Sequence, residues 1–258
     1  ALVFYSADTK LDAEKYWFDL GRRFYDKTKS LIKATDDVKQ TAATVTADAK
    51  SPEEKLERIY EFCRTKVTNV SNDASGITAD ERKKLKDNKS PSDTLKRGKG
   101  TGDDIDLLFA ALATASGFDA RIALAPDRGD IFFDNDIRSL PNAYFLETSN
   151  IAINVEGKWR FFHPGFNYVP FGMLRWREEG EQALITDPKQ PIWVPTPTSE
   201  PSKSLVKRRA KFKLAEDGTL EGDVQIEFTG HFAVDRKEDS DDESETQREE
   251  SLKEEIKD

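Results

Sequence analysis

The sequence predicts an α+β fold, because clear helix signals come first along the chain and strand and hairpin signals follow. One helix start is marked at Ser51, and a second, apolar helix follows a glycine-rich stretch that ends at Gly102. Turn dipeptides between runs of apolar residues then predict two β-hairpins. With 258 residues, the chain is long enough for one main core and a smaller appended part.

The first well-marked helix starts with a complete set of N-terminal signals. Ser51 is a favourable N-cap, Pro52 suits the first helical position, and Glu54 supplies a capping-box carboxylate. Apolar residues then recur at helical spacing, which predicts one buried face. That face holds Leu56, Ile59, Tyr60, Cys63 and Val67. Cys63, the only cysteine, is therefore expected to be a buried structural residue.

The second helix is expected to begin near Gly102 and to end at Gly117, a typical C-cap. The glycines before it invite a phosphate-binding hypothesis, because backbone N–H groups at a helix start attract anions. The stretch does not fit the P-loop pattern, and Asp103 and Asp104 would repel phosphate, so this hypothesis is set aside.

A metal site is a further alternative, since Asp106 joins these two aspartates and His163 lies further along the chain. A lone histidine with carboxylates at this spacing matches no known ligand set. The sequence therefore predicts neither a metal nor a cofactor.

The strand signals divide the rest of the chain. A strand is predicted over 121–125, a hairpin around Glu156-Gly157 and a second hairpin around Asp217-Gly218, with a proline-rich linker after Asp187. The predicted organisation is a lead-in helical arm over 1–50, a core over 51–197, a β-hairpin or the start of a β-domain over 198–237, and an acidic tail over 238–258.

Charge and hydropathy exclude two classes of partner. The net charge is -9, and the stretch 236–258 alone carries five basic and eleven acidic side chains. Binding to nucleic acid requires clustered basic residues, so no nucleic-acid partner is expected. No apolar run approaches the roughly 20 residues that a transmembrane helix needs, so no membrane insertion is expected.

Four segments, in this order, resemble the bacterial transglutaminase-like superfamily, which shares the fold of papain-like cysteine peptidases. The segments are Ile59–Cys63, Arg97–Asp104, Ala115–Arg121 and Gly157–Pro164. The resemblance covers about residues 51–197, and residues 168–174 resemble a segment of the subgroup flanked by β-rich domains. It implies a core of helices packed on an antiparallel sheet.

The resemblance also implies where a catalytic Cys-His-Asp triad would lie. In the family, a cysteine thiolate is favoured at a helix N-terminus, a histidine takes its proton, and an aspartate orients the histidine. The matched segments place the nucleophile at Gly102, beside Asp103, and the aspartate at His163. The histidine would lie in the window Thr148–Ile151, which includes Asn150 and Ile151. None of these positions holds the family's residue.

The sequence thus predicts a pseudoenzyme with no catalytic residue, whose former cleft binds a protein, peptide or glycan or forms a domain interface. The alternative is a hydrolase or acyltransferase with rearranged catalytic residues, which would require Cys63, His163 or a carboxylate in one exposed cleft. The family's exported members imply the periplasm or cell envelope.

Overall fold

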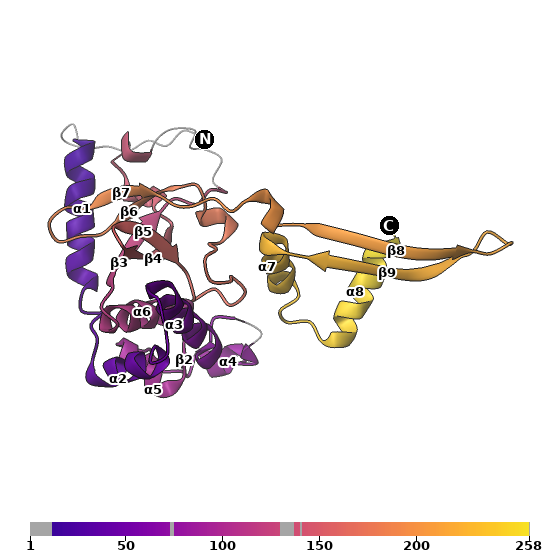
Figure 1. Ribbon diagram of the computed structural model, residues 1–258, viewed down its shortest axis with the longest axis horizontal. Helices are drawn as coiled ribbons and strands as arrows, with labels where there is room; N and C mark the ends of the chain where they lie inside the picture. The colour runs from indigo at the N-terminus through magenta and orange to yellow at the C-terminus, as the bar shows by residue number, and fades with distance from the viewer. Residues whose placement is uncertain (1–11, 73–74, 130–136, 140, 258) are drawn as a thin grey trace. The chain divides into compact units, whose positions relative to one another are not determined.

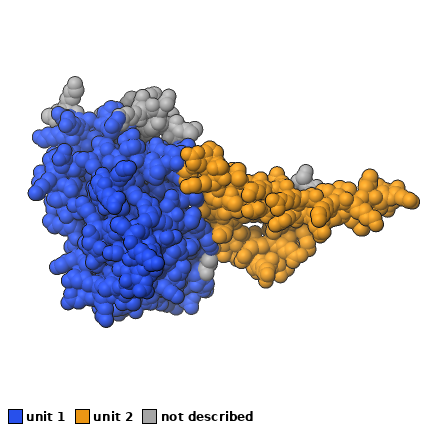
Figure 2. All heavy atoms as spheres, in the orientation of Figure 1, with its two compact units in different colours: residues 1–198 blue, residues 199–258 orange. Residues whose placement is uncertain are grey.

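The computed structural model describes residues 12–72, 75–129, 137–139 and 141–257, and the chain divides into two compact units. Unit 1 ends at Thr198 and unit 2 begins at Ser199, and Figure 2 colours the units separately. The predicted boundary after residue 197 lies one residue before this division. No helix in the described ranges has the length and apolar character that crossing a membrane requires.

Unit 1 begins with its helices. They are α1 (Ala13–Thr28), α2 (Asp36–Val45), α3 (Pro52–Lys66), α4 (Ala79–Arg82), α5 (Pro91–Arg97) and α6 (Gly102–Ala115). The predicted start of α3 is confirmed, because the Ser51 hydroxyl accepts a hydrogen bond from the Glu54 N–H at 3.1 Å. The predicted second half of the capping box, a hydrogen bond from the Ser51 N–H to the Glu54 carboxylate, is replaced by one from the Lys50 N–H at 2.8 Å.

A five-stranded antiparallel sheet in the order β5-β4-β3-β6-β7 forms the other layer of unit 1. Its strands are β3 (Asp119–Ala125), β4 (Thr148–Val155), β5 (Lys158–Phe162), β6 (Gln182–Ile185) and β7 (Ile192–Pro195). The predicted α+β fold, with helices packed on an antiparallel sheet, is confirmed. The predicted hairpin β4-β5 is also confirmed, and its turn residues Glu156 and Gly157 have φ of 53° and 84°.

A separate parallel pair, β1 (Thr68–Asn69) and β2 (Lys99–Gly100), lies next to the start of α6. Short 3-10 turns complete the unit. They are η2 (Ile137–Ser139), η3 (Ala143–Phe145) and η4 (Trp176–Glu178).

The largest core cluster lies between the sheet and the helices α2, α3, α5 and α6, which gather on one side of it (Figure 1). Helix α6 contributes most to this core because it is apolar nearly all round, with Ile105, Leu108 and Phe109 each at most 1% exposed. Within the stretch expected to be a lead-in arm, α2 buries Val38 and Ala42 in the same cluster. The opposite face of the sheet is covered by the segment after β5, through Leu174.

The predicted proline-rich linker after Asp187 is wrong in its middle part, where β7 pairs with β6. Proline is tolerated in edge strands because one side of the backbone needs no partner, and β7 lies at the edge of the sheet. The short apolar run Ile192–Val194 is enough to form a strand there.

Unit 2 holds the second predicted hairpin, which is confirmed as β8 (Val206–Leu214) paired with β9 (Leu220–Phe228). The turn has Gly218 at φ 87°, the left-handed backbone that glycine favours. η5 (Pro201–Lys203) precedes the hairpin and α7 (Gly230–Asp239) follows it. No helix was predicted from the sequence at the position of α7. The predicted acidic tail contains the helix α8 (Glu245–Lys257).

We expect that deleting residues 241–258 changes the melting temperature by less than about 2 °C. The deleted stretch has few apolar residues, and Leu252 in α8 is still 36% exposed. Thermal unfolding monitored by circular dichroism would check this. A fall of many degrees would mean that the acidic tail packs as a stabilising element.

Candidate functional site

His163 lies directly after β5 and is buried between two carboxylates. Its Nε2 is 3.1 Å from Oδ2 of Asp106, and its Nδ1 is 2.7 Å from Oε1 of Glu178. Asp106 comes from the second turn of α6 and Glu178 from η4. The three side chains are at most 9% exposed. We call them the Asp106-His163-Glu178 cluster.

The backbone just after His163 lies against the first turn of α6. The Gly165 N–H donates to Oδ1 of Asp106 at 2.8 Å, and the Gly165 carbonyl accepts from Nδ2 of Asn69 at 2.7 Å. Asn69 comes from β1, so Gly165 is held from both sides. A Cβ placed on Gly102 would lie 3.0 Å from the Gly165 carbonyl oxygen, and a Cβ on Gly165 would overlap the Gly102 carbonyl. The two glycines therefore allow close backbone contact.

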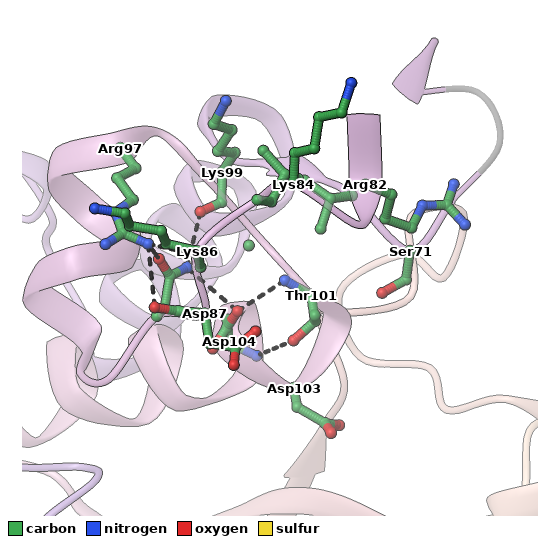
Figure 3. Close-up of a pocket in the computed structure, with 14 residues that line it drawn as sticks. Ser71, Arg82, Lys84, Lys86, Asp87, Arg97, Lys99, Thr101, Asp103 and Asp104 are labelled. Atoms are coloured by element: carbon green, nitrogen blue, oxygen red, sulfur yellow. Dashed lines mark hydrogen bonds between the residues drawn. The ribbon is translucent and has the colours of Figure 1, made fainter. Parts of the chain in front are cut away.

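This contact shows where the predicted site residues lie. The structure brings Gly102 against Gly165, two residues from His163, so both ends of the expected cleft are in one region. Asp103 lies elsewhere, because its side chain lines a separate pocket on the outer side of the helix start (Figure 3).

The window Thr148–Ile151 opens β4, next to the cluster. The Thr148 hydroxyl donates to the Ala125 carbonyl at 3.1 Å, and Ile151 is buried in the main core. Asn150 is 1% exposed, and neither its Nδ2 nor its Oδ1 has a hydrogen-bond partner among the described residues. In the β4-β5 register, Ile151 pairs with Phe162. If the same register continued by one residue beyond β5, Asn150 would lie opposite His163.

Cys63 lies in α3 with no exposed surface, as predicted from its place on the apolar face. Burial raises the pKa of the Cys63 thiol well above its usual value, and the charge of Asp106 adds to the effect. The thiol is therefore neutral at physiological pH, and a neutral thiol is a poor nucleophile.

We expect the native protein to resist alkylation of Cys63 by iodoacetamide at neutral pH, whereas the protein unfolded in urea should be alkylated fully. Mass spectrometry after timed quenching would measure the two rates. Rapid labelling of the native protein would show that α3 exposes its inner face.

The two carboxylates control the charge state of His163. Burial alone would lower the pKa of the imidazole, but the nearby charges of Asp106 and Glu178 outweigh it and raise the pKa to about 10. Burial also raises the pKa of Asp106 above its usual 3.8, against the opposing effect of His163. Both shifts mean that the folded cluster binds more protons than the unfolded chain does.

The sign of the pH dependence follows from these shifts. A histidine whose pKa is raised from 6.5 to about 10 stabilises the fold fully below pH 6.5, and this contribution is lost as the pH rises through 10. We expect the free energy of unfolding to fall between pH 7 and 10 in urea titrations. The fall should be smaller in a variant with His163→Gln, Asp106→Asn and Glu178→Gln, which removes the cation without leaving an unpaired buried carboxylate. Parallel curves for the two proteins would contradict a protonated His163.

Asn69 and Glu178 are the site residues that sequence reasoning missed, whereas Asp106 was considered only as a metal ligand beside His163 and was set aside. Asp106 carried a signal, because a carboxylate between Ile105 and Phe109 on an apolar helix requires a buried partner. Glu178 and Asn69 carried none, since η4 and β1 are short and lie far from α6 in the sequence.

The comparison with protein families agrees with this geometry. Residues 39–164 match the model of the transglutaminase-like superfamily. The similarity covers just under half of the chain. The matched stretch includes α6, β4, β5 and His163, and it begins inside α2, before the predicted core start at residue 51. No curated protein matches the chain significantly.

Two solved structures resemble the chain at low identity. A "putative protease" from Parabacteroides distasonis is 14% identical, with a TM-score of 0.43, over 68% of this chain and 30% of that one. A "putative cysteine protease" from Cytophaga hutchinsonii is 18% identical, with a TM-score of 0.34, over 61% of this chain and 43% of that one. The aligned part is thus less than half of either structure.

Proposed function

We propose that this transglutaminase-like domain is a non-catalytic binding or scaffolding module. The observation that carries the proposal is the closed backbone contact between Gly102 and Gly165 at the start of α6. Gly102 stands where the resemblance places the nucleophile, and it has no side chain to attack a carbonyl carbon. The Gly165 carbonyl oxygen lies only 3.0 Å from the position that the first atom of such a side chain would take.

The state of His163 supports the same proposal. A general base needs a ring nitrogen with a free lone pair directed at the proton that it accepts. In the Asp106-His163-Glu178 cluster both ring nitrogens face carboxylate oxygens, and the raised pKa keeps both protonated. The imidazolium is a buried cation that links α6 to η4.

The alternative of rearranged catalysis lacks an accessible nucleophile among the candidates. Cys63 has no exposed surface and a raised pKa, and His163 is 7% exposed. The Asp106 and Glu178 carboxylates are bound to His163. The cluster is therefore better suited to hold segments together than to act on a substrate.

Turnover assays on the native protein test the proposal. Casein hydrolysis and incorporation of a fluorescent amine into casein cover the two reactions expected of a relative, with papain and a transglutaminase as positive controls. We expect rates equal to the buffer blank. An activity that co-purifies with the protein, and that Cys63→Ala or Asp106→Asn abolishes, would establish the enzyme alternative instead.

A further inference from the structure

A pocket of about 630 Å³ lies on the outer side of the start of α6, formed by the segment 82–88 and by residues around β2 (Figure 3). Its wall carries five basic residues. They are Arg82, Lys84, Lys86, Arg97 and Lys99. This local excess of positive charge stands out in a chain whose net charge is -9.

The carboxylates that line the pocket do not cancel this excess. Oδ2 of Asp104 accepts from the Thr101 N–H at 2.9 Å and from Nδ2 of Asn88 at 3.2 Å, so it serves to cap α6. The Asp103 carboxylate points away from the lysines in Figure 3. Asp87 is the third acidic residue of the wall, so the five basic residues still outnumber the acidic ones.

Arg97 stabilises the pocket wall through hydrogen bonds to the segment 86–88. Its Nη1 donates to the carbonyls of Lys86 and Asp87, at 2.7 and 3.2 Å, and to Oδ1 of Asn88 at 2.8 Å. Nδ2 of Asn88 in turn donates to the Lys99 carbonyl at 2.9 Å. These bonds fix the backbone of the wall without using any lysine ammonium group.

The ammonium groups of three lysines are therefore available to bind a ligand. Lys84, Lys86 and Lys99 are exposed, and none forms an ion pair with the residues that the structure describes. Lys84 and Lys99 extend to the same side of the pocket, away from Asp104 (Figure 3). Their charges add in the space between them, which attracts an anion there.

We propose that this pocket binds an acidic peptide segment, with the ammonium groups of Lys84, Lys86 and Lys99 each facing a carboxylate. The inference deepens the proposed binding role and rests on it. The size suits a short segment, because pockets of roughly 300–1,000 Å³ hold ligands of several hundred daltons. Val70 and Leu85 also line the pocket and offer apolar contact to such a chain.

The geometry favours spaced carboxylates over a single phosphate group. A phosphate site gathers converging donors, often with a bidentate arginine. Here the Arg97 Nη1 is already bound to the wall. At the start of α6 the Asp104 carboxylate accepts from the Thr101 N–H, the Thr101 hydroxyl accepts from the Asp104 N–H, and the charge of Asp104 opposes a phosphate there. Separate lysines instead act as point charges and suit carboxylates spread along a chain.

Fluorescence anisotropy with labelled hexaglutamate on the full chain tests the proposal, at low salt where exposed charges are least screened. Hexaglutamine is the neutral control peptide. We expect only hexaglutamate to bind. A variant with Lys84→Gln, Lys86→Gln and Lys99→Gln should bind it at least about tenfold more weakly, since each exposed ion pair contributes up to about 1 kcal/mol.

A matched variant controls for the change in net charge. Lys207→Gln, Lys211→Gln and Lys213→Gln remove three exposed lysines from β8 in unit 2, and this variant should bind hexaglutamate as the wild type does. Equal weakening in the two variants, no binding of hexaglutamate, or its displacement by an equal concentration of inorganic phosphate would each overturn the proposal. None of these results affects the non-catalytic role, which the turnover assays test separately.

Discussion

Replacing His163 with alanine is expected to lower the free energy of unfolding by about 3–5 kcal/mol. The change removes the cation that lies between Asp106 and Glu178 and leaves two buried carboxylates without their partner. A buried charge that loses its partner keeps the full cost of desolvation, which is why the effect exceeds that of an exposed ion pair. Urea unfolding at pH 7 would measure it.

Two further variants separate this explanation from a simple loss of packing. His231→Ala, at the second histidine of the chain, is the control in unit 2 and should cost less. Adding Asp106→Asn and Glu178→Gln to His163→Ala should recover part of the loss, because the buried charges are then gone. A loss of less than 1 kcal/mol for His163→Ala, or no recovery in the triple variant, would contradict the charged cluster.

Gly165→Ala is expected to cost about 1–3 kcal/mol, because the added Cβ overlaps the Gly102 carbonyl and neither backbone segment moves easily. The movement would also stretch the hydrogen bonds from the Gly165 N–H to Asp106 and from Asn69 to the Gly165 carbonyl. Thermal and urea unfolding would both report the loss.

Gly102→Ala makes the matched control on the other side of the same contact. Its Cβ would lie 3.0 Å from the Gly165 carbonyl, a tight contact that a small shift relieves, and alanine favours the helix by up to about 1 kcal/mol over glycine. We expect a much smaller change than for Gly165→Ala. Equal effects at the two positions would mean that the first turn of α6 and the Gly165 segment are not in close contact.

The sequence predicted the elements whose signals are local. The cap at Ser51, the left-handed turns of the β4-β5 hairpin and at Gly218, and the apolar length of α6 each depend on residues within a few positions of one another. The helix α7 was missed because its apolar residues show little helical periodicity.

The candidate site was less predictable, because its contacts join segments distant in the sequence. His163 meets Asp106 from 57 residues earlier and Glu178 from a short turn with no pattern of its own. The resemblance located Gly102 and His163, but the family's aspartate position gave no reason to expect a protonated histidine between carboxylates. The close approach of Gly165 to Gly102 depends on backbone positions that no residue pattern specifies.

We propose that the region where the resemblance places a catalytic site is closed by the contact between Gly102 and Gly165, and not merely that a nucleophile is missing from it. Introducing Gly102→Cys and measuring amide hydrolysis and amine transfer tests this most directly. We predict rates equal to those of the wild type, because His163 cannot accept the thiol proton and the Gly165 carbonyl crowds the new side chain. Turnover that saturates with substrate, and that alkylation of the introduced thiol abolishes, would contradict the claim.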